Sequence, residues 1–268
     1  MKLQQLYSYT RRAIDTWKMI DEGDKIAIGV SGGKDSLTML YALKGLQRFY
    51  PKHFELEAIT VDLGLGNFNM DPVKCLCDEL DIHYTIVPTE IGPIIFDHLR
   101  EKNPCSLCAK MRKGALNNKA LELGCNKIAL GHHYDDVIET ILMGMLYGGQ
   151  VQTMMPKLHS TNFEGMELIR PMYLIREDEI KRWRDYNDLH FIQCACKFTD
   201  TCTSCNPDNA SKRQEIKNMI KQMSKINPQV ESNIFKSVEN VNLDTVIAFK
   251  KDGVKHNFLE KYKNKEKE

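Results

Sequence analysis

The feature that most constrains the fold is a regular alternation of short apolar runs with longer amphipathic stretches. The apolar runs have the length of buried strands and fall at residues 25–30, 56–62, 83–87, 127–131 and 167–169. The amphipathic stretches have helical spacing and cover residues 34–49, 72–80, 105–123 and 135–147. This order predicts an α/β fold, a doubly wound parallel sheet of five strands with helices on both faces. In such sheets ligands bind beyond the carboxyl ends of the strands.

Two parts of the chain fall outside this alternation. Residues 1–22 predict a helical preface, and beyond residue 193 a cysteine-rich stretch leads into helical stretches at 211–226 and 228–241. The last residues are rich in lysine and glutamate, which predicts a solvated end. We therefore divide the chain into a preface (1–22), an α/β domain (23–193), a cysteine-rich and helical extension (194–249) and a charged tail (250–268).

Composition and charge argue against several classes of protein. The 268 residues are 42% hydrophobic and 27% charged, as in ordinary globular proteins. No apolar run approaches the ~20 residues that cross a bilayer, and residues 1–17 do not resemble a signal peptide. We expect a cytoplasmic protein with no membrane association. A net charge of +1 argues against a globally basic nucleic-acid binder but leaves room for a local basic face.

A glycine-rich loop joins the first predicted strand to the first predicted helix. Its sequence is Ser31-Gly32-Gly33-Lys34-Asp35-Ser36. Backbone N–H groups at a helix N-terminus bind phosphate, the glycines let the main chain approach closely, and Lys34 adds a positive charge. It is not a Walker loop, because Ile28 stands where glycine is needed and Asp35 where Ser or Thr follows the lysine. Asp35 is instead suited to hold Mg²⁺ beside the phosphates.

A plain glycine turn is the alternative interpretation of this loop. The whole run at this junction, however, resembles the signature of the N-type ATP pyrophosphatases, a group that includes GMP synthetase, lysidine synthetase and the tRNA thiolases. The resemblance implies an adenine-nucleotide alpha-hydrolase-like fold and an enzyme that cleaves ATP to AMP and pyrophosphate. In such an enzyme ATP adenylates a carbonyl oxygen, and a nucleophile then displaces AMP.

Clustered cysteines in a reducing compartment indicate metal binding or redox chemistry rather than disulfides. Cys105 and Cys108 stand at the start of a predicted helix, where their spacing places both sulfurs on one face and the helix N-terminus favours thiolate. Arg112 continues this stripe and is suited to hold an anion. A second group consists of Cys194, Cys196, Cys202 and Cys205. The two groups suit zinc or an iron–sulfur cluster, while a pair of inert buried thiols is the alternative for the first group.

Much of the chain resembles one subfamily, the tRNA 2-thiocytidine synthetases. The matching blocks are residues 19–24, 105–108, 110–114, 127–136, 147–149, 155–158 and 191–194. The resemblance implies a [4Fe-4S] cluster held by Cys105, Cys108 and Cys194, whose open iron carries the sulfur that attacks an activated base. It also implies tRNA as the substrate, with a cytidine of the anticodon loop converted to 2-thiocytidine. A sulfur donor such as a cysteine desulfurase is an implied partner, and a homodimer is compatible with the family.

The second cysteine group departs from the family pattern, which has Cys-x-x-Cys at this place. Here Cys194-Ala-Cys196 is followed by a separate pair, so that Cys196 is the substitute for Cys194 as third ligand. The spare thiols of Cys202 and Cys205 are left for a small zinc site or a persulfide relay. The remaining cysteines match no family ligand and are interpreted as small apolar residues: Cys75, Cys77 and Cys125.

Further candidates lie at the ends of two other predicted strands. Gly131 permits close approach of ATP, and Asp136 is the candidate for holding Mg²⁺ or for orienting the base as an acid–base group. Asp135 either shares this role or caps the following helix. His132 is a candidate contact of the nucleotide, with a structural histidine as the alternative. Asp62 is a candidate contact of the nucleoside, with a strand-end turn as the alternative.

Basic residues are the candidates for contacts with RNA, although each alone is equally well a solvated surface charge. They are Arg11, Arg12, Lys110, Lys113, Lys212 and Arg213. Two other functions stay open at this point. A lysidine-synthetase-like tRNA ligase would attack with an amine and would have no need of Cys105 and Cys108. A non-catalytic zinc or iron–sulfur protein that binds nucleic acid would leave the phosphate loop unexplained.

Overall fold

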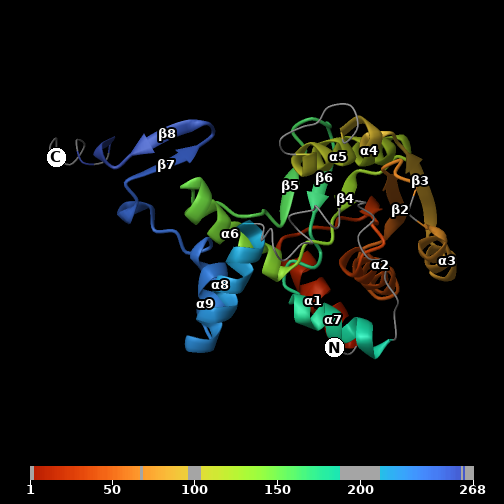
Figure 1. Cartoon of the computed structure of the whole chain (residues 1–268), viewed down its shortest axis with the longest axis horizontal. Helices are drawn as coiled ribbons and strands as arrows, with labels where there is room; N and C mark the ends of the chain where they lie inside the picture. Colours follow the sequence, from red (N-terminus) through yellow and green to blue (C-terminus); the bar gives the residue numbers. More distant parts are fainter. Residues whose placement is uncertain (1–2, 67–68, 96–103, 188–211, 261, 263–268) are drawn as a thin grey trace.

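A six-stranded sheet forms the centre of the protein in the computed structural model, which describes residues 3–66, 69–95, 104–187, 212–260 and 262 (Figure 1). The strand order is β3-β2-β1-β4-β6-β5. Five strands run parallel: β1 (Asp24–Gly29), β2 (Phe54–Asp62), β3 (His83–Pro88), β4 (Lys127–Ala129) and β6 (Glu167–Ile169). These strands lie where the apolar runs predict them, which confirms the α/β fold.

The sixth strand corrects the predicted number of five. β5 (Lys157–His159) pairs antiparallel with β6 at the edge of the sheet. It has three residues, of which only Leu158 is apolar, so it carries no hydrophobic run from which a strand could be recognised. An ion pair of 3.0 Å between Lys157 and Glu167 joins the two strands.

Helices cover both faces of the sheet (Figure 1). Their bounds are α1 (Leu3–Thr16), α2 (Lys34–Leu46), α3 (Asp71–Glu79), α4 (Ile91–Pro93), α5 (Pro104–Glu122), α6 (Tyr134–Gly148), α7 (Glu177–Tyr186), α8 (Lys212–Ile226) and α9 (Val230–Ser237). β1 supplies both faces in alternation: Ile26 and Ile28 join the core beneath α1, α2 and α7, whereas Ala27 joins the core beneath α5. The central strand is thus buried on both sides, as a parallel sheet requires.

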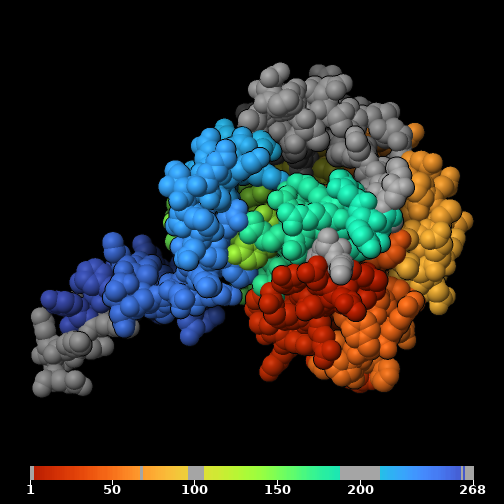
Figure 2. Space-filling model, turned by 90° about the horizontal axis from the view of Figure 1, so that it is seen from below, coloured from red at the N-terminus to blue at the C-terminus, as the bar shows by residue number. Residues whose placement is uncertain are grey.

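The C-terminal part of the chain extends away from this body (Figure 2). α9 packs on α6, where the rings of Tyr134 and Phe235 stack with centroids 4.4 Å apart. Beyond a 3₁₀ turn (Leu243–Thr245), β7 (Ala248–Lys251) and β8 (Val254–Asn257) form a hairpin. Its turn, Asp252-Gly253, has positive φ at both residues, which suits the twist of a two-residue hairpin. Part of the predicted tail, 250–268, is therefore this hairpin. In the described part of the chain, no helix has the length and apolarity to cross a membrane.

The packing of α1 against α2 depends on the absence of a side chain at Gly45. A Cβ at this position would overlap the ring of Tyr7. We expect Gly45→Ala to lower the free energy of unfolding by about 1–3 kcal/mol, because the ring must leave its packing position. Gly114→Ala on α5 is the matched control: its Cβ would meet open space, and the gain in helix propensity should stabilise the protein by about 0.5–1 kcal/mol. Thermal denaturation measures both, and equal effects of the two substitutions would contradict the packing argument.

Candidate active site

The loop between β1 and α2 is folded as a phosphate site requires. Gly32 has a φ of 74°, a left-handed conformation that favours glycine. The Ser36 hydroxyl donates to the Gly33 carbonyl (3.0 Å) and accepts from the Ser31 N–H (3.2 Å), which closes the loop on the first turn of α2. Among the described residues no side chain caps the helix at Gly33. The first N–H groups of α2 are therefore available to an anion.

The segment after β4 meets this loop closely. A Cβ at Gly131 would lie 3.1 Å from the backbone carbon of Asp35 and 3.2 Å from the Ser36 nitrogen, so glycine is needed for the approach. A cavity of 820 Å³ opens between these segments and α5. Its polar lining comes from Ser31, Asp35, Ser36, Arg112, Lys113, Asn117, His132, Asp136 and Arg213. The volume and mixed lining suit a nucleotide-sized ligand.

Two carboxylates hold the loop lysine. Lys34 Nζ lies 2.9 Å from Asp35 Oδ2 and 3.3 Å from Glu177 Oε1, at the start of α7. Glu177 carries no local sequence signal, because α7 is strongly polar and buries only Ile180 and Trp183. The sequence therefore predicts neither α7 nor this partner of Lys34. A bound phosphate would compete with these two carboxylates for the ammonium group of Lys34.

Asp136 lies at the floor of the cavity within a network of charges. Its carboxylate accepts from the His133 N–H (3.0 Å) and from Arg213 Nη1 (2.8 Å), which also reaches Glu139 at 3.2 Å. Burial opposes ionisation of Asp136, but the His133 imidazole, its backbone N–H and Arg213 together lower the pKa of Asp136. Asp136 is therefore ionised and able to bind a cation or accept a proton.

The structure contradicts the alternative that Asp135 is the N-cap of α6. His133 occupies the cap position of α6, and Asp135 lies within its first turn. The Asp135 carboxylate accepts from Arg176 Nη2 (3.1 Å) and from the Glu177 N–H (2.7 Å). Arg176 also pairs with Glu231 of α9 at 2.6 Å. Asp135 therefore ties α6 to α7 and α9 instead of capping its own helix.

His132 lines the cavity next to a buried arginine. Arg170 Nε donates to His132 Nδ1 (3.3 Å), and its guanidinium also reaches the Met155 carbonyl. Burial and the positive charge of Arg170 lower the pKa of His132 to about 4, while burial lowers that of Arg170 to about 10. His132 is therefore neutral at physiological pH and accepts through Nδ1, which leaves the ring able to contact a nucleotide but not as a cation.

The described cysteines differ in their surroundings. Cys108 lies on α5 next to Ala109, which lines the cavity, and is itself buried against Ile91 and Ile95. Cys77 and Cys125 are buried, and burial raises the pKa of these thiols to about 12 and about 11, as in inert apolar positions. Cys75 is exposed. The side chain of Cys105 lies outside the described residues, as do Cys194, Cys196, Cys202 and Cys205.

The other candidates lie in several places. Asp62 is not among the described residues that line the cavity, and its carboxylate accepts from the Gly64 N–H (3.0 Å) in a strand-end turn. Arg213, a candidate RNA contact, binds Asp136 at the cavity with 42% of its side chain exposed, and Lys113 lines the same cavity. The remaining basic candidates are distributed on the surface: Arg11 pairs with Asp15, Arg12 lies over Tyr9, Lys212 lies over Tyr147, and Lys110 is exposed on α5.

Similarity to known proteins agrees with this geometry. Residues 3–223 match the family of the PP-loop domain. The tRNA-cytidine(32) 2-sulfurtransferase of Syntrophotalea carbinolica is 36% identical over 239 residues, which cover 89% of each chain. The enzyme of the same name from Alcanivorax borkumensis is 37% identical over 242 residues, 90% of this chain and 82% of the relative. The chain belongs to the PP-loop family, in the group of the tRNA 2-thiocytidine synthetases.

A solved structure supports this membership. The U34-tRNA thiolase NcsA from Methanococcus maripaludis, solved with its [4Fe-4S] cluster, aligns with a TM-score of 0.68 and 26% identity. The alignment covers 87% of this chain and 76% of NcsA. The family match spans the β1–α2 junction, where the Ser31–Ser36 turn lies. The sequence does not predict Asn117, which lines the cavity, nor Glu139, Arg170 and Glu177, each of which acts through a partner far away in the chain.

Glu139 should make the stability of this PP-loop protein depend on pH. Burial raises the pKa of Glu139 to about 7 from its ordinary 4.5. Below about pH 4.5 the carboxyl is protonated in both the folded and the unfolded protein, so burial of its charge costs nothing. Above about pH 7 it is ionised in both states, and the folded protein bears the full cost of the buried charge. We expect Glu139→Gln to gain on the order of 2–3 kcal/mol of stability relative to wild type between about pH 5 and pH 8.

Denaturant unfolding at several pH values measures this difference. Glu55→Gln, at an exposed carboxylate on β2, controls for the loss of one negative charge. A constant difference between the Glu139→Gln variant and wild type over the whole range would contradict the raised pKa.

Proposed function

We propose that the chain is an ATP-dependent tRNA thiolase that adenylates the C2 carbonyl of a pyrimidine and replaces its oxygen with sulfur. One observation carries the proposal. The phosphate loop and the cysteine-bearing helix α5 line the same cavity, the loop through Ser31 and Ser36 and the helix through Ala109 and Arg112. A nucleotide on the loop and a sulfur site at the start of α5 would therefore face one substrate.

The phosphate loop supplies the activation step. The N–H groups at the start of α2 and the ammonium of Lys34 would bind the phosphates, and the carboxylates of Asp35 and Asp136, which both line the cavity, would hold Mg²⁺ beside them. The pyrimidine C2 oxygen attacks the α-phosphorus, a bond to AMP forms, and pyrophosphate leaves. Positive charge around the phosphates stabilises the charge that develops on the leaving group.

The donor set at α5 fits an iron–sulfur cluster. Cys105 and Cys108 are three positions apart on α5, a spacing typical of residues on one face of a helix, and thiolates are the ligands that such clusters take. Cys194 is the proposed third ligand, with Cys196 as its substitute. A [4Fe-4S] cluster bound there would supply the sulfur nucleophile that displaces AMP. The protein itself keeps water from the activated base through the apolar wall of the cavity, which includes Leu116 and Leu130.

Cytidine in the anticodon loop is the proposed target. The relatives that carry the name tRNA-cytidine(32) 2-sulfurtransferase match at 36% and 37% identity, whereas the U34 thiolase NcsA matches at 26%. Arg112 and Lys113 at the mouth of the cavity are suited to RNA phosphates. A cysteine desulfurase or another sulfur donor must renew the sulfur after each turnover.

Activation and sulfur transfer should separate in two variants. We expect Lys34→Ala to lower AMP formation on the order of 100-fold and to retain iron, because a positive charge at the phosphates is lost. Cys105→Ala should bind ATP normally but lose iron and sulfur transfer, because a cluster ligand is lost. Anaerobic iron and sulfide analysis and AMP release measure the two properties. Cys75→Ala, at an exposed cysteine outside the site, is the control and should retain both. Full thiolation by the Cys105→Ala variant would refute the ligand assignment.

The modified nucleoside identifies the substrate. We expect a strain that lacks this gene to lose 2-thiocytidine from its tRNA, because sulfur transfer by this protein is the step that makes this nucleoside. Returning the gene should restore 2-thiocytidine. Mass spectrometry of tRNA nucleosides measures the change. Loss of a 2-thiouridine instead would shift the target to the base that NcsA modifies, and an unchanged profile would refute thiolation.

A further inference from the structure

Glu177 lies between the phosphate loop and the C-terminal extension. Its carboxylate is 3.3 Å from Lys34 of the loop, 2.6 Å from Lys217 of α8 and 3.2 Å from Lys181 of its own helix. The side chain is largely buried, with 14% of its surface exposed. One carboxylate thus holds three ammonium groups, two of which belong to different parts of the fold.

The position of Glu177 is fixed by its neighbours. Its N–H donates to Asp135 on α6 (2.7 Å), and the preceding residue, Arg176, pairs with Asp135 and with Glu231 on α9. Three helices therefore meet at the start of α7. The backbone of Glu177 is thus held in place, while Lys34 contacts Oε1 of its carboxylate and Lys217 and Lys181 contact Oε2.

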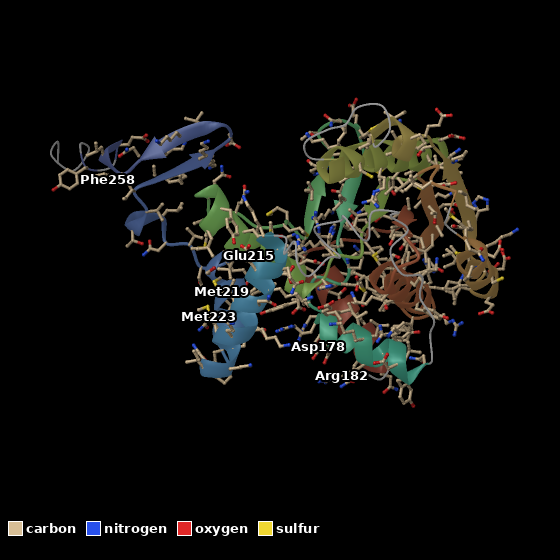
Figure 3. All side chains as sticks on the ribbon, in the orientation of Figure 1. Asp178, Arg182, Glu215, Met219, Met223 and Phe258 are labelled. Carbon is tan, nitrogen blue, oxygen red and sulfur yellow. The ribbon has the colours of Figure 1, made fainter. Side chains whose placement is uncertain are left out.

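α8 packs on the protein through Ile216 and Ile220, which are buried in the main hydrophobic core, and it also contacts α6 and α7 through charges. Arg213 reaches Asp136 and Glu139, and Lys217, one turn later, reaches Glu177. Their spacing of four places both cations on one face of α8. In Figure 3, Glu215, Met219 and Met223 mark α8, and Asp178 and Arg182 mark α7, the two helices that the ion pair between Lys217 and Glu177 joins. In the sequence, α8 directly follows the cysteine-rich stretch.

We propose that Glu177 is a positioning residue that couples occupancy of the phosphate loop to the docking of α8. A phosphate that takes the Lys34 ammonium removes one of three mutually repelling cations from Glu177. The carboxylate then interacts more strongly with Lys217, and α8 is held more firmly. Because coupling between two sites is reciprocal, docking of α8 in turn strengthens the binding of phosphate to Lys34. The inference rests on the proposed use of ATP, and it links nucleotide binding to the helix adjacent to the cysteine-rich stretch.

Hydrogen exchange of the α8 amides tests the coupling in the full-length protein that carries its cluster. In wild type, saturation with Mg²⁺ and a non-hydrolysable ATP analogue should slow exchange of α8 by about fivefold or more. Glu177→Gln keeps the shape of the side chain but not its charge, and should remove this slowing. Lys217→Met should remove it as well and weaken binding of the analogue by the same factor.

Lys181→Met is the matched control, because Lys181 pairs with the same carboxylate but lies on α7 and reaches neither the loop nor α8. It should keep the slowing. If Glu177→Gln keeps the wild-type response, or if Lys181→Met loses it equally, the coupling is refuted. The test needs no tRNA: a coupled α8 in a protein that does not thiolate would refute the proposed function alone, and an unresponsive α8 in an active thiolase would refute this inference alone.

Discussion

The close approach of the segments that follow β1 and β4 is the constraint on which the site depends. The two strands are parallel neighbours, with Ile26 opposite Lys127 and Ile28 opposite Ala129, so both chains leave the sheet at the same edge. Gly131 then lies so close to the backbone of Asp35 that a Cβ at this position would come within 3.1 Å of it. The nucleotide loop and the acidic start of α6 consequently face one cavity. Sheet register, rather than any local motif, brings them together.

A network of ion pairs at the amino ends of the strands holds this register. Lys127 is buried and binds Asp24 at 2.9 Å, Glu167 at 3.0 Å and Asp21 at 3.1 Å, which joins β4 to the strands on both sides. Burial opposes the charge of Lys127, but the hydrogen bonds to its three carboxylates raise the pKa of the ammonium. Loss of one of these carboxylates would leave the buried ammonium less well compensated. The fold therefore places a permanent ion network at the amino ends of the strands and exchangeable ion pairs at the carboxyl ends.

The sequence predicts those parts of the molecule that have a local physical signal. Apolar runs locate the five parallel strands, and the glycines of the phosphate loop locate its turn, because burial and positive φ each demand particular residue types. β5 and α7 lack such a signal: one has three residues, and the other buries only Ile180 and Trp183. Glu177 escapes prediction for a different reason. Its role depends on Lys217, 40 positions later in the chain, and an isolated glutamate in a polar helix has the pattern of a solvated residue.

Arg213 illustrates how the fold changes the meaning of a charge. As sequence it is one basic residue among several near the C-terminus, and a contact with RNA is the natural interpretation. In the structure its guanidinium binds two carboxylates of α6, Asp136 and Glu139, from the helix that follows the cysteine-rich stretch. Also on α6, Asp135 binds Arg176, the residue before α7. Carboxylates of the first two turns of α6 thus bind both α7 and α8. α6 therefore serves as the frame that fixes the extension relative to the nucleotide cavity.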